Sequence, residues 1–216
     1  VDSSFFILSG YDLAFLSETK FSPNGNHFAI ATFTDKKVFV CDFDRCTGQM
    51  SNCRLVFDEN TTGVDDNSRA YGFEFSSSSE YLYLSGTNGL YQIQLSRQND
   101  SVYIIEEDFE HYLESIGYYQ NEKDYLLGQL ELMPNGQIAV SHWSYTDGQC
   151  CTYDTVNQYL SVIEAPDQAG TACGWNPLSM KVADGERRFF WGLPHFPNYR
   201  LGPDERCANS ISEESV

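Results

Sequence analysis

Three stretches of this chain repeat one pattern, in which a short apolar segment breaks at a tight turn and resumes as an alternating strand. The three copies cover residues 20–31, 74–84 and 131–140. Phe21 and Phe75 hold equivalent positions 54 residues apart, and Leu132 follows Phe75 after a further 57 residues. A period of this length indicates a repeat architecture in which each copy is one supersecondary unit. The repeat constrains the fold more than any other feature of the sequence.

Each repeat continues into further short strands separated by turn residues, which predicts a four-stranded antiparallel sheet. Aromatic residues make up 15% of the chain, and Tyr and Phe suit pleated, half-buried surfaces. We therefore expect an all-β fold, a β-propeller segment of about three to four four-stranded blades. The predicted organisation is the terminal strand of a preceding blade at 1–13, blades at 14–57 and 70–106, a third blade with the closing segment at 107–202, and a mobile acidic tail at 203–216.

Two insertions, at 107–124 and 144–157, interrupt the predicted third blade. In the first, the spacing of Phe109 and Leu113 predicts a short helix or an ordered loop above the blade. Residues 166–188 are rich in loop-forming residues, so the last strand is expected at 189–191.

A propeller has to close into a ring, because an open stack exposes strand edges and an apolar flank. The expected blades are fewer than the roughly six to eight of most propellers. The chain therefore forms either a small ring of about four blades or, as we favour, the C-terminal part of a larger propeller. In the second case, further blades or another chain complete the propeller.

The net charge of −18 results from 31 acidic and 13 basic residues. A field of this sign repels phosphate backbones and anionic membrane surfaces, which argues against nucleic-acid binding. No apolar run approaches the roughly 18 residues of a membrane-spanning helix. The sequence at Val1 does not resemble a leader peptide, so we expect a mature chain or a fragment.

Seven cysteines are many for a reduced cytosolic protein, and they predict disulfides in an exported one. Cys46 and Cys53 flank a loop between two predicted strands and are the best candidates for a bridge. Cys41 alternates with Phe39 and Phe43 along a strand, which favours a small core residue. The disulfide candidates are Cys46, Cys53, Cys150, Cys151, Cys173 and Cys207.

Several phrases of the sequence resemble one family. They are FDRCTGQMSN at 43–52, the strand pair at 73–84, YQIQL at 91–95, the segment 128–138 that begins with GQL, GTAC at 170–173 and LPHFPNYRLG at 193–202. The chain resembles the WD40/YVTN-like propeller modules of large secreted proteins of Bacteroidota, which accompany PKD-type repeats and type IX secretion. The resemblance covers roughly residues 15–205, and the closing motif is its most specific part. It implies missing blades in front of the chain and adhesion-type modules behind it, and it carries over no catalytic residues.

Acidic residues at the end of the strand at 38–44 are weak candidates for a calcium site, because Ca²⁺ prefers several carboxylate oxygens. These residues are Asp42 and Asp44, although the full calcium-loop pattern is absent, and solvated acids at a strand end are the favoured explanation. We therefore expect no cofactor, and Ca²⁺ is the alternative.

His142 and Trp143 end a predicted inner strand, where they could face a central funnel, or His142 could be a satisfied core histidine. Aromatic residues of the neighbouring loops can stack on sugars or fill pockets of a partner, and packing between blades is the alternative. The candidate binding residues are His142, Trp143, Tyr145, Tyr118, Tyr119 and Trp175.

The sequence thus favours a secreted or cell-surface β-propeller that acts as a binding or structural module, in adhesion or as an assembly scaffold. Its expected partners are proteins or carbohydrates at the cell exterior. The alternative is a polysaccharide-active hydrolase or lyase whose site lies in the propeller funnel. Convergent carboxylates, or a histidine with a strongly shifted pKa, would favour the enzyme.

Overall fold

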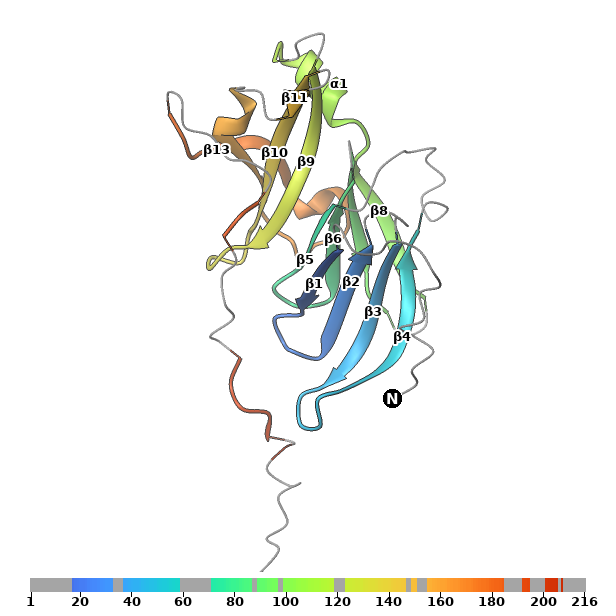
Figure 1. Ribbon diagram of the computed structural model, residues 1–216. Coiled ribbons are helices and arrows are strands. Elements are labelled where there is room, and N and C mark those ends of the chain that lie inside the picture. The colour runs from blue at the N-terminus through green and yellow to red at the C-terminus, as the bar shows by residue number, and fades with distance from the viewer. Residues whose placement is uncertain are drawn as a thin grey trace, which may run out of the picture.

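The computed structural model describes residues 17–32, 37–58, 71–86, 89–96, 99–118, 123–146, 149–150, 155–184, 192–194, 201–205 and 207. Within them the chain forms three antiparallel sheets of hairpin-connected strands, which pack against one another face to face (Figure 1). The protein is therefore all-β, with three blade-like sheets, as the repeat predicts.

The strands of each sheet follow one another in sequence order. The first sheet contains β1 (Ser17–Phe21), β2 (His27–Thr32), β3 (Lys37–Asp44) and β4 (Gln49–Phe57). The second contains β5 (Gly72–Phe75), β6 (Tyr81–Ser85), β7 (Leu90–Gln94) and β8 (Ser101–Glu106). The third contains β9 (Lys123–Leu132), β10 (Ile138–Thr146), β12 (Tyr159–Ile163) and β13 (Trp175–Lys181), with the two-residue strand β11 (Gln149–Cys150) paired to the end of β10.

The first turn of each repeat closes in the same way. The amide N–H groups of Gly25, Ser79 and Gly136 each donate to the carbonyl oxygen three residues earlier, at 2.8, 2.9 and 2.9 Å. All three residues have a positive φ, of 71°, 66° and 88°, a region that favours glycine. Ser79 therefore occupies a glycine position of the repeat, and its hydroxyl accepts a hydrogen bond from the Asn24 amide of the neighbouring sheet at 3.2 Å.

The first strands of the three sheets converge. β5 lies against both β1 and β9, so β1, β5 and β9 form the inner edge of the stack. Gly72 on β5 makes this approach possible, because a Cβ there would lie 2.8 Å from Gln129 Cα and 2.9 Å from Gly128 O. The Ser85 hydroxyl then donates to Gly128 O at 2.7 Å. Inner strands meet in this way when blades are arranged around a common axis.

Two apolar cores lie between the sheets. The first is formed by alternate residues of the facing flanks of the first two sheets, including Val38, Val40, Phe73 and Phe75. The second joins the second and third sheets and includes Tyr83, Leu127 and Ile138. A smaller cluster on the far flank of the third sheet, around Ala139 and Leu160, is covered by Leu193 of the C-terminal segment.

One short α-helix, α1 (Phe109–Ser115), lies in the first predicted insertion. The Asp108 carboxylate caps it by accepting from the His111 amide at 3.0 Å. Phe109 and Leu113, one turn apart, are buried in the second core, so the predicted helix is confirmed. Gly117, at φ 76°, ends the helix. No helix of the described part of the chain has the length and apolar character to cross a membrane.

The third sheet departs from the prediction at its outer edge. Residues 166–188 were expected to be loop-rich, but β13 lies within them, after the two short 3-10 helices η2 (Val156–Gln158) and η3 (Gly170–Cys173). Pro177 weakened the strand pattern in the sequence, and Leu178 next to it has a positive φ of 51° in the structure. Both are tolerated because β13 is an edge strand with an irregular register against β12. The strand expected at 189–191 lies outside the described residues.

The predicted disulfide between Cys46 and Cys53 is wrong. Cys53 pairs with Cys41, so Cys41 is a bridged residue of the sheet rather than a free core thiol. Cys46 pairs with Cys207, across a sequence separation of 161. Cys173, another disulfide candidate, is a buried free thiol.

The prediction is wrong because each cysteine has a better-placed partner. Cys53 has a cysteine across the strand pair, and Cys46 has one in a distant segment of the chain. The register that pairs Phe39 with Leu55 and Val40 with Arg54 brings Cys53 opposite Cys41 on the neighbouring strand. Cys151 and the side chain of Cys150 lie outside the described residues. So do residues 1–13, where a preceding strand was expected.

The C-terminal segment returns to the first sheet. Besides the Cys46–Cys207 bridge, an Arg45 guanidinium N–H donates to Gly202 O. Within the tail expected to be mobile from residue 203, Cys207 is thus covalently bound to the first sheet. Together these contacts connect the end of the described chain to the β3–β4 hairpin.

Candidate functional site: a charged cluster on the axis

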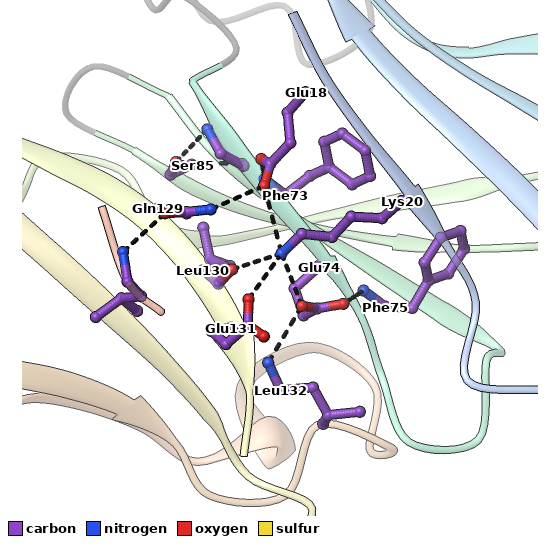
Figure 2. Close-up of polar contacts among 12 residues, drawn as sticks. Glu18, Lys20, Phe73, Glu74, Phe75, Ser85, Gln129, Leu130, Glu131 and Leu132 are labelled. Atoms are coloured by element: carbon purple, nitrogen blue, oxygen red, sulfur yellow. Dashed lines mark hydrogen bonds and ion pairs between the residues drawn. The ribbon is translucent and has the colours of Figure 1, made fainter. Parts of the chain in front are cut away.

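The inner edge of the stack carries four charged side chains in contact, which we call the axial cluster: Glu18, Lys20, Glu74 and Glu131. Lys20 Nζ lies 2.8 Å from Glu74 Oε2, 3.3 Å from Glu131 Oε2 and 3.4 Å from Glu18 Oε1 (Figure 2). It also donates to the Leu130 carbonyl oxygen at 2.8 Å. One ammonium therefore joins all three inner strands.

Three of these residues occupy one position of the sequence repeat. Lys20, Glu74 and Glu131 immediately precede Phe21, Phe75 and Leu132. Side chains at this position point from each inner strand toward the same point, as Figure 2 shows. The repeat therefore builds the cluster, since equivalent positions of successive blades meet at the axis.

Backbone amides hold two of the carboxylates in place. Glu74 accepts from Phe75 N at 2.8 Å through Oε1 and from Leu132 N at 3.2 Å through Oε2. Glu18 accepts from Phe73 N at 2.9 Å and from the Gln129 side-chain amide at 3.2 Å. In each case a carboxylate of one sheet binds an amide N–H of the next sheet, so the cluster fixes the sheets relative to one another.

Burial and charge act against each other in this cluster. Burial alone would lower the pKa of Lys20, but the carboxylates of Glu74, Glu18 and Glu131 outweigh it and raise that pKa above its ordinary value. Burial raises the pKa of Glu74, with a contribution from Glu131, while Lys20 and the Phe75 amide act in the opposite direction. Burial and the Glu18 carboxylate also raise the pKa of nearby Tyr71 to about 12.

The arrangement is suited to holding sheets together rather than to acid–base chemistry. The side chains of Lys20, Glu74 and Glu131 are only 11%, 8% and 6% exposed. Both oxygens of Glu74 already accept hydrogen bonds, and Lys20 contacts four acceptors. A substrate would have to displace these contacts before it could reach a carboxylate.

The sequence prediction of binding residues did not include the axial cluster. The available signal was a charged residue at one repeat position in all three copies, at the end of strands that otherwise alternate. Sequence alone gives no distance between copies. It could therefore not show that Lys20 contacts Glu74 and Glu131, which lie 54 and 111 positions away.

The predicted binding residue His142 lies in the core. Its Nδ1 is 3.1 Å from Tyr159 O and its Nε2 is 2.8 Å from Ser161 Oγ, and its ring stacks on Phe109 of α1 at 5.0 Å. Burial lowers its pKa to about 4, although the contact with Tyr159 raises it slightly. This shift has a packing cause, because His142 is buried and both of its ring nitrogens have protein partners.

The predicted aromatic residues do not form one surface in the described structure. Trp175 packs on the second core, and its indole N–H donates to Glu106 at 3.2 Å. Trp143 is half-buried, and Tyr118 is exposed just after α1. Tyr119 and the side chain of Tyr145 lie outside the described residues.

The weak calcium candidates have protein partners. The Asp42 carboxylate contacts His27 at 3.4 Å and accepts from the Asn52 amide at 2.9 Å. Asp44 accepts from the backbone amides of the following turn, at 2.8 and 3.3 Å. Within the described residues, a close group of metal-ligating types is Cys46, Asp204 and Cys207, but its two sulfurs are joined in a disulfide.

No family model and no curated protein sequence matches the chain. Among solved structures it is similar to the PQQ domain of pyranose dehydrogenase from Coprinopsis cinerea, with 11% identity, a TM-score of 0.43, and coverage of 74% of this chain and 36% of that one. It is also similar to a protein from Lactobacillus plantarum, with 16% identity, a TM-score of 0.45, and coverage of 78% and 42%. The chain thus spans less than half of either structure. Both TM-scores are too low to support an argument, so the β-propeller-like fold rests on the three stacked four-stranded sheets.

Proposed function

We propose that this protein is an exported β-propeller module that works by binding, as an adhesion or assembly scaffold at the cell exterior. The observation that carries the proposal is the contrast between its interior and its surface. The polar groups that meet at the axis are satisfied by one another, whereas large apolar side chains such as Phe21 (51%) and Leu55 (44%) are exposed. Phe21 contacts Phe28 and Phe43, with ring centroids 5.1 and 4.8 Å apart, and an apolar surface of this kind is suited to binding a partner.

Export is supported by two disulfides, one of which joins segments 161 residues apart. Structural disulfides persist in oxidising compartments. The motifs at 43–52 and 193–202 resemble those of exported Bacteroidota proteins, so type IX secretion is part of the proposal. Proteins or carbohydrates of the cell exterior are the proposed partners.

A polysaccharide-active hydrolase or lyase is the alternative, and one observation favours it. Glu74 and Glu131 both contact Lys20 Nζ, and glycosidases use a pair of neighbouring carboxylates of which one has a raised pKa. Burial of the pair, and the amides bound to Glu74, argue against it.

One assay on the intact, disulfide-bonded protein separates the two functions. The protein is incubated with a panel of bacterial and plant polysaccharides and with extracellular matrix proteins. Retention is measured by affinity electrophoresis, and new reducing ends or unsaturated products are measured in the same samples. Binding without product supports the proposal. Product formation that is lost in a folded Glu74→Gln variant would establish the enzyme instead.

A further inference from the structure

The two disulfides within the described residues lie in different surroundings. Cys41 is fully buried on β3, and its partner Cys53 on β4 is half-buried. Cys46 lies in the turn that joins β3 to β4, where it is half-buried, and so is its partner Cys207. Both residues of the Cys46–Cys207 bridge thus reach the surface of the molecule, whereas one residue of the other bridge does not.

This difference decides which bridge a reductant opens more readily. Reduction begins when a thiolate attacks one sulfur of a disulfide and expels the other sulfur as a thiolate. Attack at Cys53 would expel a thiolate at Cys41, where complete burial disfavours the negative charge. Attack on the Cys46–Cys207 bridge expels a thiolate at the surface, whichever sulfur is attacked. The Asp204 carboxylate, within 4.8 Å of both sulfurs, opposes this thiolate, but water and salt screen the repulsion at the surface.

The bridges also differ in what holds their thiols together after opening. Cys41 and Cys53 lie on paired strands, and the β3–β4 pairing continues on both sides of them. Their thiols therefore stay adjacent, at a high effective concentration, and the bridge closes again. Cys207 instead belongs to a C-terminal segment in which most of the described residues before it are exposed: Leu201, Gly202, Pro203 and Glu205. A segment that buries so little surface can carry its thiol away.

The C-terminal segment connects the two ends of the described stack. Leu193 covers the far flank of the third sheet. Leu201 lies against the β1–β2 turn of the first sheet, where a Cβ on Gly25 would come within 2.9 Å of Leu201 Cδ2. The Cys46–Cys207 bridge fixes the segment beside the β3–β4 turn, where Figure 1 shows it in red. The bridge thus fastens a strap that runs from the third sheet to the first.

We propose that the Cys46–Cys207 bridge is a redox-sensitive clasp, which a dithiol reductant opens while the sheets stay folded. Two electrons and two protons pass from the dithiol to the bridge, which becomes the thiols of Cys46 and Cys207, and the reductant leaves as a disulfide. Opening frees the strap from the first sheet, while both apolar cores and the Cys41–Cys53 bridge remain. The inference goes beyond the proposed binding function, because it adds a control over the C-terminal segment that does not depend on what the module binds.

The test is reduction of the intact, disulfide-bonded protein under native conditions. Dithiothreitol is added, samples are alkylated with N-ethylmaleimide at intervals, and peptide mass spectrometry measures the modified fraction of each cysteine. We expect Cys46 and Cys207 to be modified at least about tenfold faster than Cys41 and Cys53. Cys173 is the internal control, because this buried free thiol should stay unmodified as long as the protein is folded.

Release of the strap is measured separately by the heteronuclear NOE of backbone amides, which reports motion on the picosecond to nanosecond timescale. The NOE of the Gly202 and Cys207 amides should fall when the clasp opens, while the amides of β5 to β7 stay unchanged. A Cys46→Ser, Cys207→Ser double variant is the matched control, since its strap should be mobile with and without reductant.

Three results would overturn the proposal. The first is that the Cys41–Cys53 bridge opens as fast as the Cys46–Cys207 bridge, or faster. The second is that Cys173 is modified together with Cys46, because opening would then unfold the protein. The third is an unchanged NOE of the Gly202 and Cys207 amides after the bridge has opened. The polysaccharide assay is carried out on the oxidised protein, so failure of the clasp and failure of the binding function are distinguishable.

Discussion

At the scale of the single residue, burial determines the protonation of His142. Its pKa lies at about 4 in the folded protein and near 6.5 when exposed, so the unfolded chain takes up a proton first as the pH falls. Stability that is complete above pH 6.5 should decline toward pH 4, by about 3 kcal/mol. Urea unfolding at pH 7 and pH 4 measures the loss, with His142→Gln as the control. The interpretation fails if the wild type and the variant lose the same amount.

Ser79 provides a second prediction at this scale, because it occupies a left-handed position that glycine fills in the other two repeats. Ser79→Gly and Ser79→Ala both lose the hydroxyl that binds the Asn24 amide. Only the glycine variant also relieves the backbone, so it should be the more stable of the two by about 1 kcal/mol. Equal thermal unfolding midpoints would contradict the assignment of this turn.

At the scale of the element, the close approach of β5 and β9 depends on Gly72. In a Gly72→Ala variant the new Cβ would meet backbone atoms of Gly128 and Gln129, which cannot move aside as a flexible side chain can. We expect a loss of about 3 kcal/mol in the free energy of unfolding. Gly202→Ala is the control, because nothing lies within 4 Å of a Cβ there and the variant should be as stable as the wild type. A well-tolerated Gly72→Ala would mean that the inner strands do not converge.

The elements also show what sequence patterns can and cannot predict here. Local periodicity sufficed for the strands of the second sheet and for α1, because Phe109 and Leu113 bury one face. It failed for β13, whose Pro177 is tolerated only because the strand ends up at a sheet edge. Edge position is a property of the assembled sheet and is not encoded in any short window of sequence.

Contacts between distant segments were the least predictable part of the molecule. Cys46 has a nearer cysteine on the same hairpin, yet it pairs with Cys207 because the C-terminal segment folds back onto the first sheet. The axial cluster likewise required knowledge that three equivalent residues meet in space. The repeat predicted the blades, while the contacts made possible by their radial arrangement became visible only in three dimensions.

At the scale of the whole molecule, the Cys46–Cys207 bridge connects the end of the described chain to its first sheet. In the chain-entropy model a loop of this length contributes about 5 kcal/mol, against about 3 kcal/mol for the short loop closed by Cys41 and Cys53. Replacing Cys46 and Cys207 by serine should therefore cost more stability than replacing the other pair. Chemical denaturation of both variants under oxidising conditions gives the comparison. The reverse order would show that the C-terminal segment does not help to close the fold.

Lys20 and Glu131, 111 residues apart, meet at an axis shared by three sheets, and the radial arrangement of the sheets depends on this contact. Lys20→Met should cost about 3–5 kcal/mol, because it leaves buried carboxylates without their cation. The exposed Lys181→Met control should leave the free energy of unfolding essentially unchanged.

The direct test is a double-mutant cycle of Lys20→Met with Glu131→Gln, measured as free energies of unfolding. Because the two side chains are in contact, we expect a coupling of about 1–3 kcal/mol between the two substitutions. Strictly additive effects would mean that the two side chains do not touch, and would contradict the radial arrangement of the sheets.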